Sequence, residues 1–289
     1  MAERAGGTLY VVATPIGNLA DITLRALDVL RDVPLIAAED TRLTRRLLDR
    51  HGIPTRLVSF HARSAPARLA ELLAHLRGGA DLALVTDAGT PAVSDPGADL
   101  VGAWAGEDGR VVPIPGASAV LAAVAATGVT GPRWAFEGFL PRSGRERRER
   151  LAAIAADPRG AVVFEAPGRV AATLRDLAAA CGEERTAAVA RELTKLHEQI
   201  VRGTLGELAG ATGEGSIPSR GEFVLVVGMG EPAGSSDAEA DLVAARAAVE
   251  RLVQDGVARG EAARRVAADT GLPRRRLYGT ATRSDGMAR

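Results

Sequence analysis

The sequence is poor in the two residue types that staple many small secreted folds and metal modules. Among 289 residues there is one cysteine, Cys181, and there are four histidines. A lone thiol cannot form an internal disulfide, and so few ligands make a Cys/His zinc site untenable. A chain this long can bury a sizeable core without either cross-link. We therefore exclude a disulfide-stapled secreted fold and expect no bound metal.

Long apolar segments are missing as well. No apolar run reaches the ~18 residues that a membrane-spanning helix needs. Residues 1–7 also lack the apolar stretch of a signal peptide. These absences lead us to expect a cytoplasmic protein with no membrane partner.

Two polar residue types are nearly absent. Lys195 is the one lysine against 35 arginines, and Asn18 is the one asparagine. Their positions could be chance survivals in a chain that has exchanged lysine for arginine. The alternative is that each position needs chemistry that arginine or aspartate cannot supply.

In the first part of the chain, short apolar runs alternate with segments of helical periodicity. For example, Leu69, Leu72 and Leu76 fall on one face of a helix over 66–77. The alternation predicts a parallel sheet with helices on both faces. The expected strands are 8–14, 35–38, 56–60, 81–86 and 111–114. One expected helix starts at Ile22, and the others span 41–50, 66–77, 96–105 and 117–126.

A turn-rich stretch over 128–133 separates this part from a second α/β region. There the expected strands are 134–139, 161–165, 186–191 and 222–228, and the helices are 144–155, 169–180 and 204–210. A flexible segment over 230–238 precedes helices at 240–254, 260–268 and 273–280, and the last two resemble a helix-turn-helix. We therefore predict two α/β domains, 1–128 and 129–230, followed by a linker and helical tail, 231–289.

The turn after the first expected strand, residues 13–21, carries a single glycine, Gly17. The pattern G-x-G-x-x-G is absent, which argues against a dinucleotide such as NAD. Asp21 can serve simply as a helix N-cap. The position of the turn at the carboxyl end of a strand nevertheless favours a binding function.

Two further turns follow expected strands. Residues 85–97 hold two Asp, two Pro, two Gly, two Thr and a Ser. This is far more than a connection requires, so the loop suits a small polar ligand. The simpler interpretation is a turn in which Ser94 or Asp95 caps the next helix. At 113–119, Ser118 considered alone is more typical of a helix cap.

Charged clusters also lie at expected strand ends. Glu39 and Asp40 close the second strand, Glu165 closes a strand of the second region, and Lys195 lies in the charged segment 190–198. Such clusters are usually solvated faces, but their placement at strand ends makes a catalytic role equally reasonable.

Taken together, these motifs resemble the tetrapyrrole-methylase superfamily, and within it the bacterial 16S rRNA (cytidine-2′-O)-methyltransferase I family. The matching segments cover roughly residues 7–230: they are 14–19, 38–42, 59–61, 86–91, 115–118, 164–167, 190–195 and 221–223. Each motif alone is modest, whereas the set is highly specific.

The resemblance implies two α/β domains with S-adenosylmethionine in the cleft between them, in a homodimer. S-adenosylmethionine carries no phosphate, and this agrees with the absence of the G-x-G-x-x-G pattern, because that pattern serves to bind a pyrophosphate. Because Pro-Ile-Gly-Asn replaces the superfamily's glycine-rich first loop, a direct contact from Asn18 is in doubt. The implied cofactor-binding residues are Pro15, Ile16, Gly17, Asp87, Gly89, Thr90, Pro91, Ser94, Asp95, Ser118 and Ala119.

The implied reaction is methyl transfer to the ribose 2′-hydroxyl of a cytidine in the decoding region of small-subunit rRNA. Holding the reactants in line can supply ~7–11 kcal/mol of the barrier. The sequence does not distinguish among the candidate general bases Asp40, His61, Glu165 and Glu192. Lys195 could act as a point charge near the hydroxyl or a phosphate, a role that the planar arginine fork fills less well.

An RNA partner requires local basic patches in a chain of net charge zero. Residues 41–68 hold seven Arg and one Asp, 142–150 hold five Arg and two Glu, and 241–289 hold ten Arg and six acids. These patches could also be solvated helix faces, and the tail could serve packing rather than rRNA docking. The candidate RNA contacts are Arg42, Arg45, Arg46, His61 and Arg63.

Three other functions stay open from the sequence alone. A tetrapyrrole C-methyltransferase could use the arginines of 41–68 to bind porphyrinoid carboxylates. A non-enzymatic nucleic-acid-binding regulator could use the C-terminal helices, although the loop 86–97 would then have no role. A nicotinamide dehydrogenase is disfavoured by the missing fingerprint.

Overall fold

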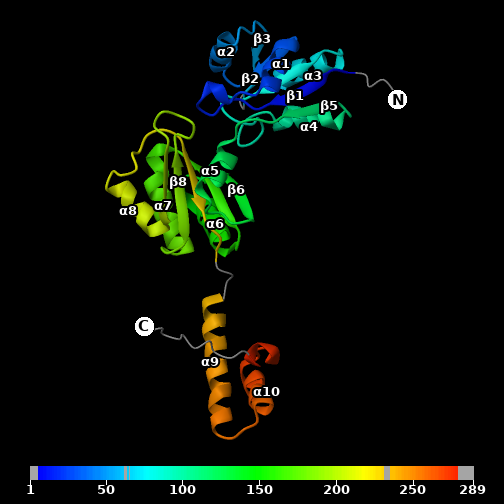
Figure 1. Ribbon diagram of the computed structural model, residues 1–289. Coiled ribbons are helices and arrows are strands. Elements are labelled where there is room, and N and C mark those ends of the chain that lie inside the picture. Colours follow the sequence, from blue (N-terminus) through cyan, green and yellow to red (C-terminus); the bar gives the residue numbers. More distant parts are fainter. Residues whose placement is uncertain (1–5, 62–63, 65, 231–234, 279–289) are drawn as a thin grey trace. The chain divides into compact units, whose positions relative to one another are not determined.

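The computed structural model describes residues 6–61, 64, 66–230 and 235–278 (Figure 1). The chain divides into two compact units, Met1–Gly230 and Glu231–Arg289. The first unit contains two five-stranded sheets with helices, and the second contains only helices. The predicted α/β fold class with C-terminal helices is therefore confirmed.

The first sheet has the strand order β3-β2-β4-β1-β5, and all of its pairings are parallel. Two clusters of buried side chains cover its faces, one around Leu30 and Leu48 and the other around Leu76 and Trp104. This confirms the parallel sheet with helices on both sides. Its strands are β1 (Thr8–Val12), β2 (Leu35–Ala38), β3 (Arg56–Ser59), β4 (Leu82–Val85) and β5 (Arg110–Ile114). Its helices are η1 (Leu19–Asp21), α1 (Leu24–Asp32), α2 (Thr41–Arg50), α3 (Pro66–Arg77) and α4 (Ala98–Gly106).

The first strand ends at Val12, two residues before the predicted end, because Thr14 leaves the ladder to pair with Gly89. The Thr14 N–H donates to the Gly89 carbonyl at 2.9 Å, and the Gly89 N–H donates back at 3.1 Å. The turn after β1 is thereby joined to the loop after β4. In a parallel sheet these two loops lie at the same edge, which is where ligands bind.

The second sheet has the order β6-β7-β10-β8-β9 and is mixed: only β6 and β7 pair in parallel. The strands are β6 (Trp134–Phe139), β7 (Gly160–Glu165), β8 (Thr186–Arg191), β9 (Gln199–Thr204) and β10 (Phe223–Val227). The helices are α6 (Gly144–Ala156), η2 (Pro167–Arg169), α7 (Val170–Cys181) and α8 (Leu205–Gly213). Strand β9 has no counterpart among the predicted strands; it is an edge strand whose side chains are half-buried or exposed rather than buried.

Helix α5 (Ala119–Thr127) follows β5 in the chain but packs on the second sheet. Val120 and Ala123 join a buried cluster with Val224 and Val226 of β10. The Arg202 guanidinium of β9 also donates to the carbonyl of Thr127 at 3.0 Å. The second sheet is therefore covered on one face by α5 and on the other by α6, α7 and α8.

The second unit contains α9 (Ser235–Gln254), α10 (Arg259–Thr270) and η3 (Arg274–Tyr278) around a small core that includes Leu242, Val249, Val266 and Leu277. The predicted helix over 273–280 is, within the described residues, a 3₁₀-helix of five residues. Residues 279 and 280 lie outside the described part of the chain. In the described part, no helix is long and apolar enough to cross a membrane, and no three His, Cys, Asp or Glu side chains are grouped to hold a metal.

Candidate active site

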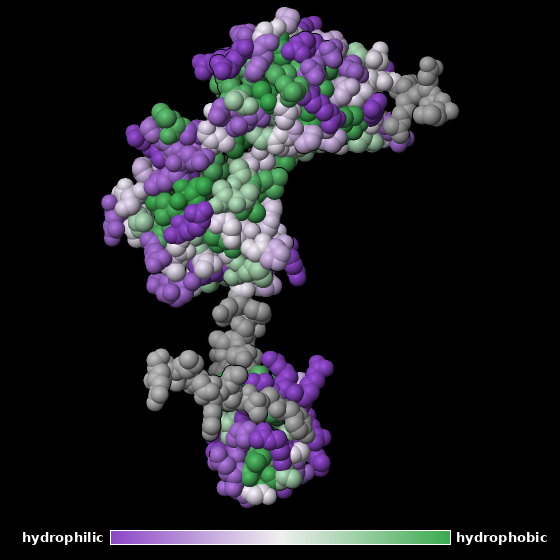
Figure 2. Space-filling model, viewed as in Figure 1, coloured by the Kyte–Doolittle hydropathy of each residue, from purple (hydrophilic) through white to green (hydrophobic). Residues whose placement is uncertain are grey.

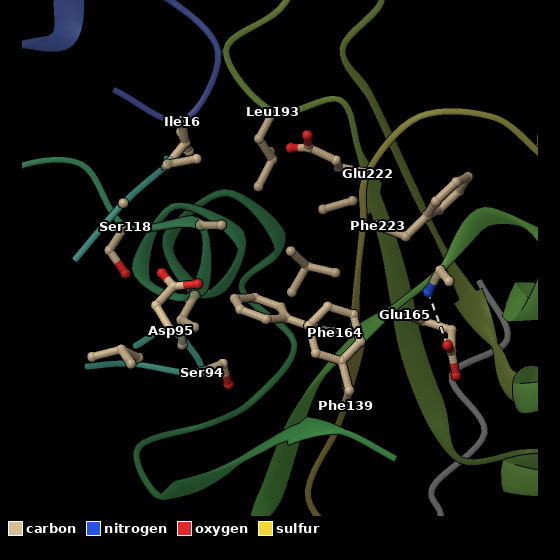
Figure 3. A pocket seen from close by; sticks show the side chains of 18 of the residues that line it. Ile16, Ser94, Asp95, Ser118, Phe139, Phe164, Glu165, Leu193, Glu222 and Phe223 are labelled. Atoms are coloured by element: carbon tan, nitrogen blue, oxygen red, sulfur yellow. Dashed lines mark hydrogen bonds between the residues drawn. The ribbon is translucent and has the colours of Figure 1, made fainter. Parts of the chain in front are cut away.

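A pocket of about 420 Å³, here called the first pocket, lies between loops of the first sheet and the strand ends of the second (Figure 3). This volume falls in the range of roughly 300–1,000 Å³ that is typical of small-molecule sites. One wall is polar and comes from the loops after β1, β4 and β5. The other wall is apolar and comes from β6, β7, β8 and β10. The polar wall includes Ile16, Gly89, Thr90, Ser94, Asp95, Ser118 and Ala119, and the apolar wall includes Phe139, Phe164, Ala190, Leu193 and Val224.

The polar wall is built on a backbone that costs conformational energy. Ala92 and Ser94 both have positive φ angles, 66° and 62°, in the loop after β4. Such conformations are rare for non-glycine residues and concentrate at functional sites. The loop begins at Thr86, whose hydroxyl donates to a Glu39 carboxylate oxygen at 2.6 Å. The loops after β2 and β4 are therefore fixed to each other.

Asp95 is the half-buried carboxyl group of the first pocket. Burial raises the pKa of Asp95 to about 6, and the charges of Glu39 and Asp87 add to this, against the effect of the Thr86 hydroxyl. Among the described residues that line this pocket there is no lysine or arginine. A ligand with a positive charge would therefore meet a carboxylate without a competing cation.

Two phenylalanines on the apolar wall contribute aromatic faces. The Phe164 ring packs edge-on against Phe136, with centroids 4.9 Å apart, and against Phe139 at 5.6 Å. Phe139 is 57% exposed although Phe164 packs against its ring, so much of the Phe139 side chain is open to a ligand. Sequence reasoning missed this wall, since phenylalanines in strands give the same signal as core residues.

A second pocket, of about 280 Å³, shares Ile16, Ala88 and Glu222 with the first. Its chemistry differs because basic side chains, Arg46 and Lys195, line it beside the acidic ones. The residues that belong to it alone are Thr14, Pro15, Gly17, Leu19, Leu43, Thr44, Arg46, Leu47, Thr86, Asp87 and Lys195.

Lys195 is held by two carboxylates. Its Nζ lies 2.9 Å from Glu192 Oε1 and 3.1 Å from Glu222 Oε2. Burial alone would lower the pKa of Lys195, but hydrogen bonds to the two glutamates outweigh this effect and raise it. The lysine is therefore a fixed cation and not a proton acceptor.

The loop that carries Lys195 crosses over the turn after β1. A Cβ atom added to Gly17 would lie 2.4 Å from Lys195 Cγ and 2.9 Å from Thr194 Oγ1. Only glycine allows so close an approach. Glu192 and Thr194, with φ angles of 51° and 67°, give this loop the same kind of backbone strain as the loop after β4.

The three candidate carboxylates Glu165, Asp40 and Glu192 have very different surroundings. The Glu165 side chain is fully buried, accepts hydrogen bonds from Thr173 Oγ1 at 2.6 Å and the Ala166 N–H at 2.8 Å, and points away from the first pocket in Figure 3. Its arrangement is that of a structural carboxylate. Hydrogen bonds from Arg42 lower the pKa of Asp40 to about 2, and Asp40 caps α2. A hydrogen bond from Lys195 lowers the pKa of Glu192.

The predicted cofactor residues divide between the two pockets. Gly89, Thr90, Ser94, Asp95, Ser118 and Ala119 line the first, whereas Pro15, Gly17 and Asp87 line the second, and Ile16 lines both. Pro91 lines neither pocket. Ser118 also accepts the Leu121 N–H of α5 at 3.4 Å, so the predicted cap is confirmed, and the binding role of Ser118 stays a prediction. Asn18 caps η1 through the Ala20 N–H at 3.1 Å, and Thr23 rather than Asp21 caps α1.

Among the candidate RNA contacts, Arg42 and Arg46 are exposed on α2, whose surroundings are hydrophilic in Figure 2. Arg46 reaches the second pocket. Arg45 instead donates to the Thr55 carbonyl at 3.0 Å, which holds the turn between α2 and β3. His61 is exposed just after β3, and Arg63 lies outside the described residues.

A site at the carboxyl edge of a parallel sheet, facing a second mixed sheet, defines the class. A family model for Tetrapyrrole (Corrin/Porphyrin) Methylases matches residues 8–209, so the chain belongs to this family.

Curated relatives narrow the comparison. A protein of Synechocystis called ribosomal RNA small subunit methyltransferase I is 46% identical over 94% of this chain and 96% of its own length. Proteins of the same name from Escherichia coli O157:H7 and Bacillus subtilis are 42% and 40% identical, over 99% and 94% of this chain and 98% and 93% of their own lengths. The family resemblance read from the motifs is thus confirmed.

Solved structures support the fold. A cobalt precorrin-4 methyltransferase superposes with a TM-score of 0.59 at 20% identity, covering 76% of this chain and 94% of that one. The uroporphyrin-III C-methyltransferase of Thermus thermophilus, solved as a complex with S-adenosyl homocysteine, gives 0.55 at 21% identity, over 77% and 97%.

Proposed function

We propose that this protein is an S-adenosylmethionine-dependent methyltransferase that methylates the ribose 2′-hydroxyl of a cytidine in the decoding region of 16S rRNA. The relatives that match nearly the whole chain are called ribosomal RNA small subunit methyltransferase I. The observation that carries the proposal is the pair of adjoining pockets. The lining of the first pocket is mostly apolar and its charged groups are all acidic, namely Asp95, Glu165 and Glu222, whereas the second pocket is also lined by Arg46 and Lys195.

The first pocket fits S-adenosylmethionine by its chemistry. The cofactor carries a sulfonium cation, an amino acid tail and an adenosine but no phosphate, and the described residues that line this pocket offer no basic side chain for a phosphate. Asp95 and the faces of Phe139 and Phe164 suit a cationic, partly aromatic ligand. When bound, the cofactor supplies an activated methyl group on a good leaving group.

The residues of the chain then mainly hold the cofactor and the methyl acceptor in position. Ser94, Asp95 and Ser118 would hold the polar parts of the cofactor, and Leu193 would exclude water on the opposite wall. Holding the hydroxyl and the methyl carbon in line can supply ~7–11 kcal/mol of the barrier. Lys195 would orient the acceptor as a fixed positive charge, while Glu165 would support the strand end through its buried hydrogen bonds.

The RNA side of the proposal depends on α2. It presents Arg46 at the second pocket and also carries the exposed Arg42, and His61 is exposed just after β3. Phosphate contacts from such a helix face would position the subunit rRNA without reading its sequence. A cytoplasmic location, a homodimer and a role of residues 231–289 in docking the ribosomal subunit belong to the same proposal. The domain division at 128/129 and 230/231 also belongs to it, with α5 of the first domain packed on the sheet of the second.

The deciding experiment incubates naked 30S subunits with the purified protein and radiolabelled S-adenosylmethionine, and then maps ribose methylation on the 16S rRNA. We expect one labelled cytidine 2′-O position in the decoding region. Parallel reactions replace the 30S subunits with uroporphyrinogen III. Label in that tetrapyrrole and none in the RNA would favour the C-methyltransferase alternative.

Calorimetry with S-adenosyl homocysteine separates the remaining alternatives. We expect binding in a one-to-one ratio with the chain. No binding, together with retained affinity for the 30S subunit, would favour a non-enzymatic regulator. A variant that ends at residue 238 should keep cofactor affinity and lose affinity for the subunit, and equal subunit affinity would contradict the docking role of the tail.

A further inference from the structure

The second pocket is placed where a methyl acceptor has to be. Reacting atoms in a group transfer must approach to about 3–3.5 Å, so the space for the acceptor must adjoin the space for the donor. The second pocket meets this condition, because Ile16, Ala88 and Glu222 line both. Its own lining combines a guanidinium, an ammonium and a carboxylate, from Arg46, Lys195 and Asp87.

We propose that the second pocket takes the target nucleoside of an RNA strand and that the Asp87 carboxylate is the group that accepts the proton of its ribose 2′-hydroxyl. This inference rests on the proposed function. Arg46, exposed on α2 at the edge of the pocket, is placed for the phosphate of the same nucleotide, and Leu43 and Leu47 give the sugar and base an apolar wall.

The step balances without any further reactant. The ribose oxygen forms a bond to the methyl carbon, and its proton passes to the Asp87 carboxylate. The methyl–sulfur bond breaks and its electron pair stays on sulfur, so that the sulfonium becomes a neutral thioether. Asp87 later releases the proton to water.

The geometry favours Asp87 over the other carboxylates. Its Oδ1 accepts the backbone N–H of Asp40 at 2.8 Å, which fixes the orientation of the carboxyl group at the pocket. Burial raises the pKa of Asp87, and the charges of Glu39 and Asp40 add to this against the effect of Arg42. A carboxylate with a raised pKa is a better base. Glu222, across the pocket, is instead engaged by Lys195.

The first test is Asp87→Asn, since asparagine keeps an oxygen for the Asp40 N–H but cannot accept the proton. The rate of methyl transfer to saturating 30S subunits in a single turnover should fall by ~10²–10⁴-fold. Calorimetric affinity for S-adenosyl homocysteine should be unchanged. Asp28→Asn is the matched control, because Asp28 lies exposed on α1 and does not line either pocket.

The pH profile separates a base from a merely structural residue. With S-adenosylmethionine saturating at every pH, so that the ionisation of Asp95 does not limit cofactor binding, the single-turnover rate of the natural protein should rise with pH as Asp87 ionises. In Asp87→Asn this dependence should vanish. The neighbouring titratable and charged groups Glu39, Asp40, Arg42, Asp95, Lys195 and Glu222 are present in both proteins. A variant that keeps the natural rate, or keeps the pH inflection, overturns the role of Asp87.

The second test fills the pocket without touching the first one. Leu43 is 44% exposed and lines only the second pocket, so Leu43→Trp places an indole where the nucleoside would lie. We expect the KM for 30S subunits to rise about tenfold or more, with cofactor affinity unchanged. Leu24→Trp, at an 81% exposed position of α1, is the control. An unchanged KM in Leu43→Trp overturns the pocket assignment.

The activity of the natural protein separates failure of the proposed function from failure of the roles assigned to Asp87 and the second pocket. If it transfers no methyl group to 30S subunits, the proposed function fails and this inference fails with it. If it methylates the subunit while Asp87→Asn and Leu43→Trp behave like their controls, only the inference fails.

Discussion

The loop after β4 and the loop after β8 have the same backbone character and opposite electrostatics. Each contains two non-glycine residues with positive φ, at Ala92 and Ser94 and at Glu192 and Thr194. The first loop gathers carboxyl groups without a cation of its own, and burial raises the pKa values of Asp87 and Asp95. In the second, Lys195 compensates Glu192 and Glu222.

The difference indicates what each loop is for. Uncompensated carboxyl groups cost free energy, which a cationic ligand or a proton in transfer can offset. A compensated ion triple is already satisfied and instead holds its loop in one place. We therefore interpret the loop after β4 as the chemical side of the site and the loop after β8 as the clamp that positions it.

Among substitutions that disturb this clamp, we expect the largest effect on activity from one at Gly17. In Gly17→Ala the new methyl group would overlap Lys195 Cγ, so the side chains of Lys195 and Thr194 must move away from the turn after β1. Since a displacement of about 1 Å can cost ~10²-fold in rate, we expect kcat/KM for 30S methylation to fall by about that factor. The measurement is steady-state methylation with labelled cofactor.

Gly210→Ala is the control for this prediction, because nothing lies within 4 Å of a Cβ atom at that position of α8. It should keep full activity. Equal activity of Gly17→Ala and Gly210→Ala would mean that the contact between the two loops does not position the acceptor.

The charge of the clamp is tested by Lys195→Arg. The planar fork of arginine is longer and cannot place a point charge between Glu192 and Glu222 as the ammonium does. We expect kcat/KM to fall about tenfold, with unchanged thermal unfolding and unchanged affinity for S-adenosyl homocysteine. Arg31→Lys on the exposed face of α1 is the reverse control. Full activity of Lys195→Arg would remove the argument that this position requires lysine.

The carboxyl groups of the loop after β4 lead us to expect that cofactor affinity depends on pH. With the pKa of Asp95 raised to about 6, the group loses its charge as the pH falls below that value. The affinity for cationic S-adenosylmethionine should then weaken, by about tenfold at pH 5. The affinity for S-adenosyl homocysteine, which lacks the sulfonium charge, should not follow. Calorimetry from pH 5 to pH 7.5 measures both.

The same raised pKa has a consequence for stability. The folded state binds the Asp95 proton more tightly than the unfolded state does, so the contribution of Asp95 to the unfolding free energy is lost as the pH rises through about 6. Asp95→Asn should remove this decline in the unfolding free energy. It should also remove the difference in pH dependence between the affinities for S-adenosylmethionine and S-adenosyl homocysteine. A natural protein whose two affinities change in parallel with pH would contradict the assignment of Asp95 to the cation.

The sequence predicts the first sheet well and the second less well, for a physical reason. Short apolar runs bounded by turn residues mark β2 to β5 and the four predicted strands of the second sheet, and the ends of all these strands differ by at most one residue from expectation. Strand β9 is a half-buried edge strand without such a run. The packing of α5 on the second sheet is a tertiary contact that no local pattern encodes.

The candidate site likewise contains residues that the sequence predicts and residues that it does not. Turn residues such as Gly89, Ser94 and Asp95 were predictable, because a strand end rich in glycine and polar groups has few structural uses. The aromatic wall at Phe139 and Phe164 was not, since its residues resemble core. The separation of Asp87 from Gly89 into different pockets depends on which way each residue of one loop faces, and spacing does not give this.

The smallest expected effect separates capping from binding at Ser118. Its oxygen accepts the Leu121 N–H at 3.4 Å, a long hydrogen bond, whereas Thr23 caps α1 at 3.1 Å and does not line either pocket. Ser118→Ala should therefore lower the unfolding free energy by only about 0.5 kcal/mol, and Thr23→Ala by about 1 kcal/mol. Urea titration measures both values. Only Ser118→Ala should also weaken S-adenosyl homocysteine binding, because Ser118 belongs to the polar wall of the first pocket. If cofactor affinity is the same in both variants, the serine is a cap alone, and the polar wall depends on the loop after β4.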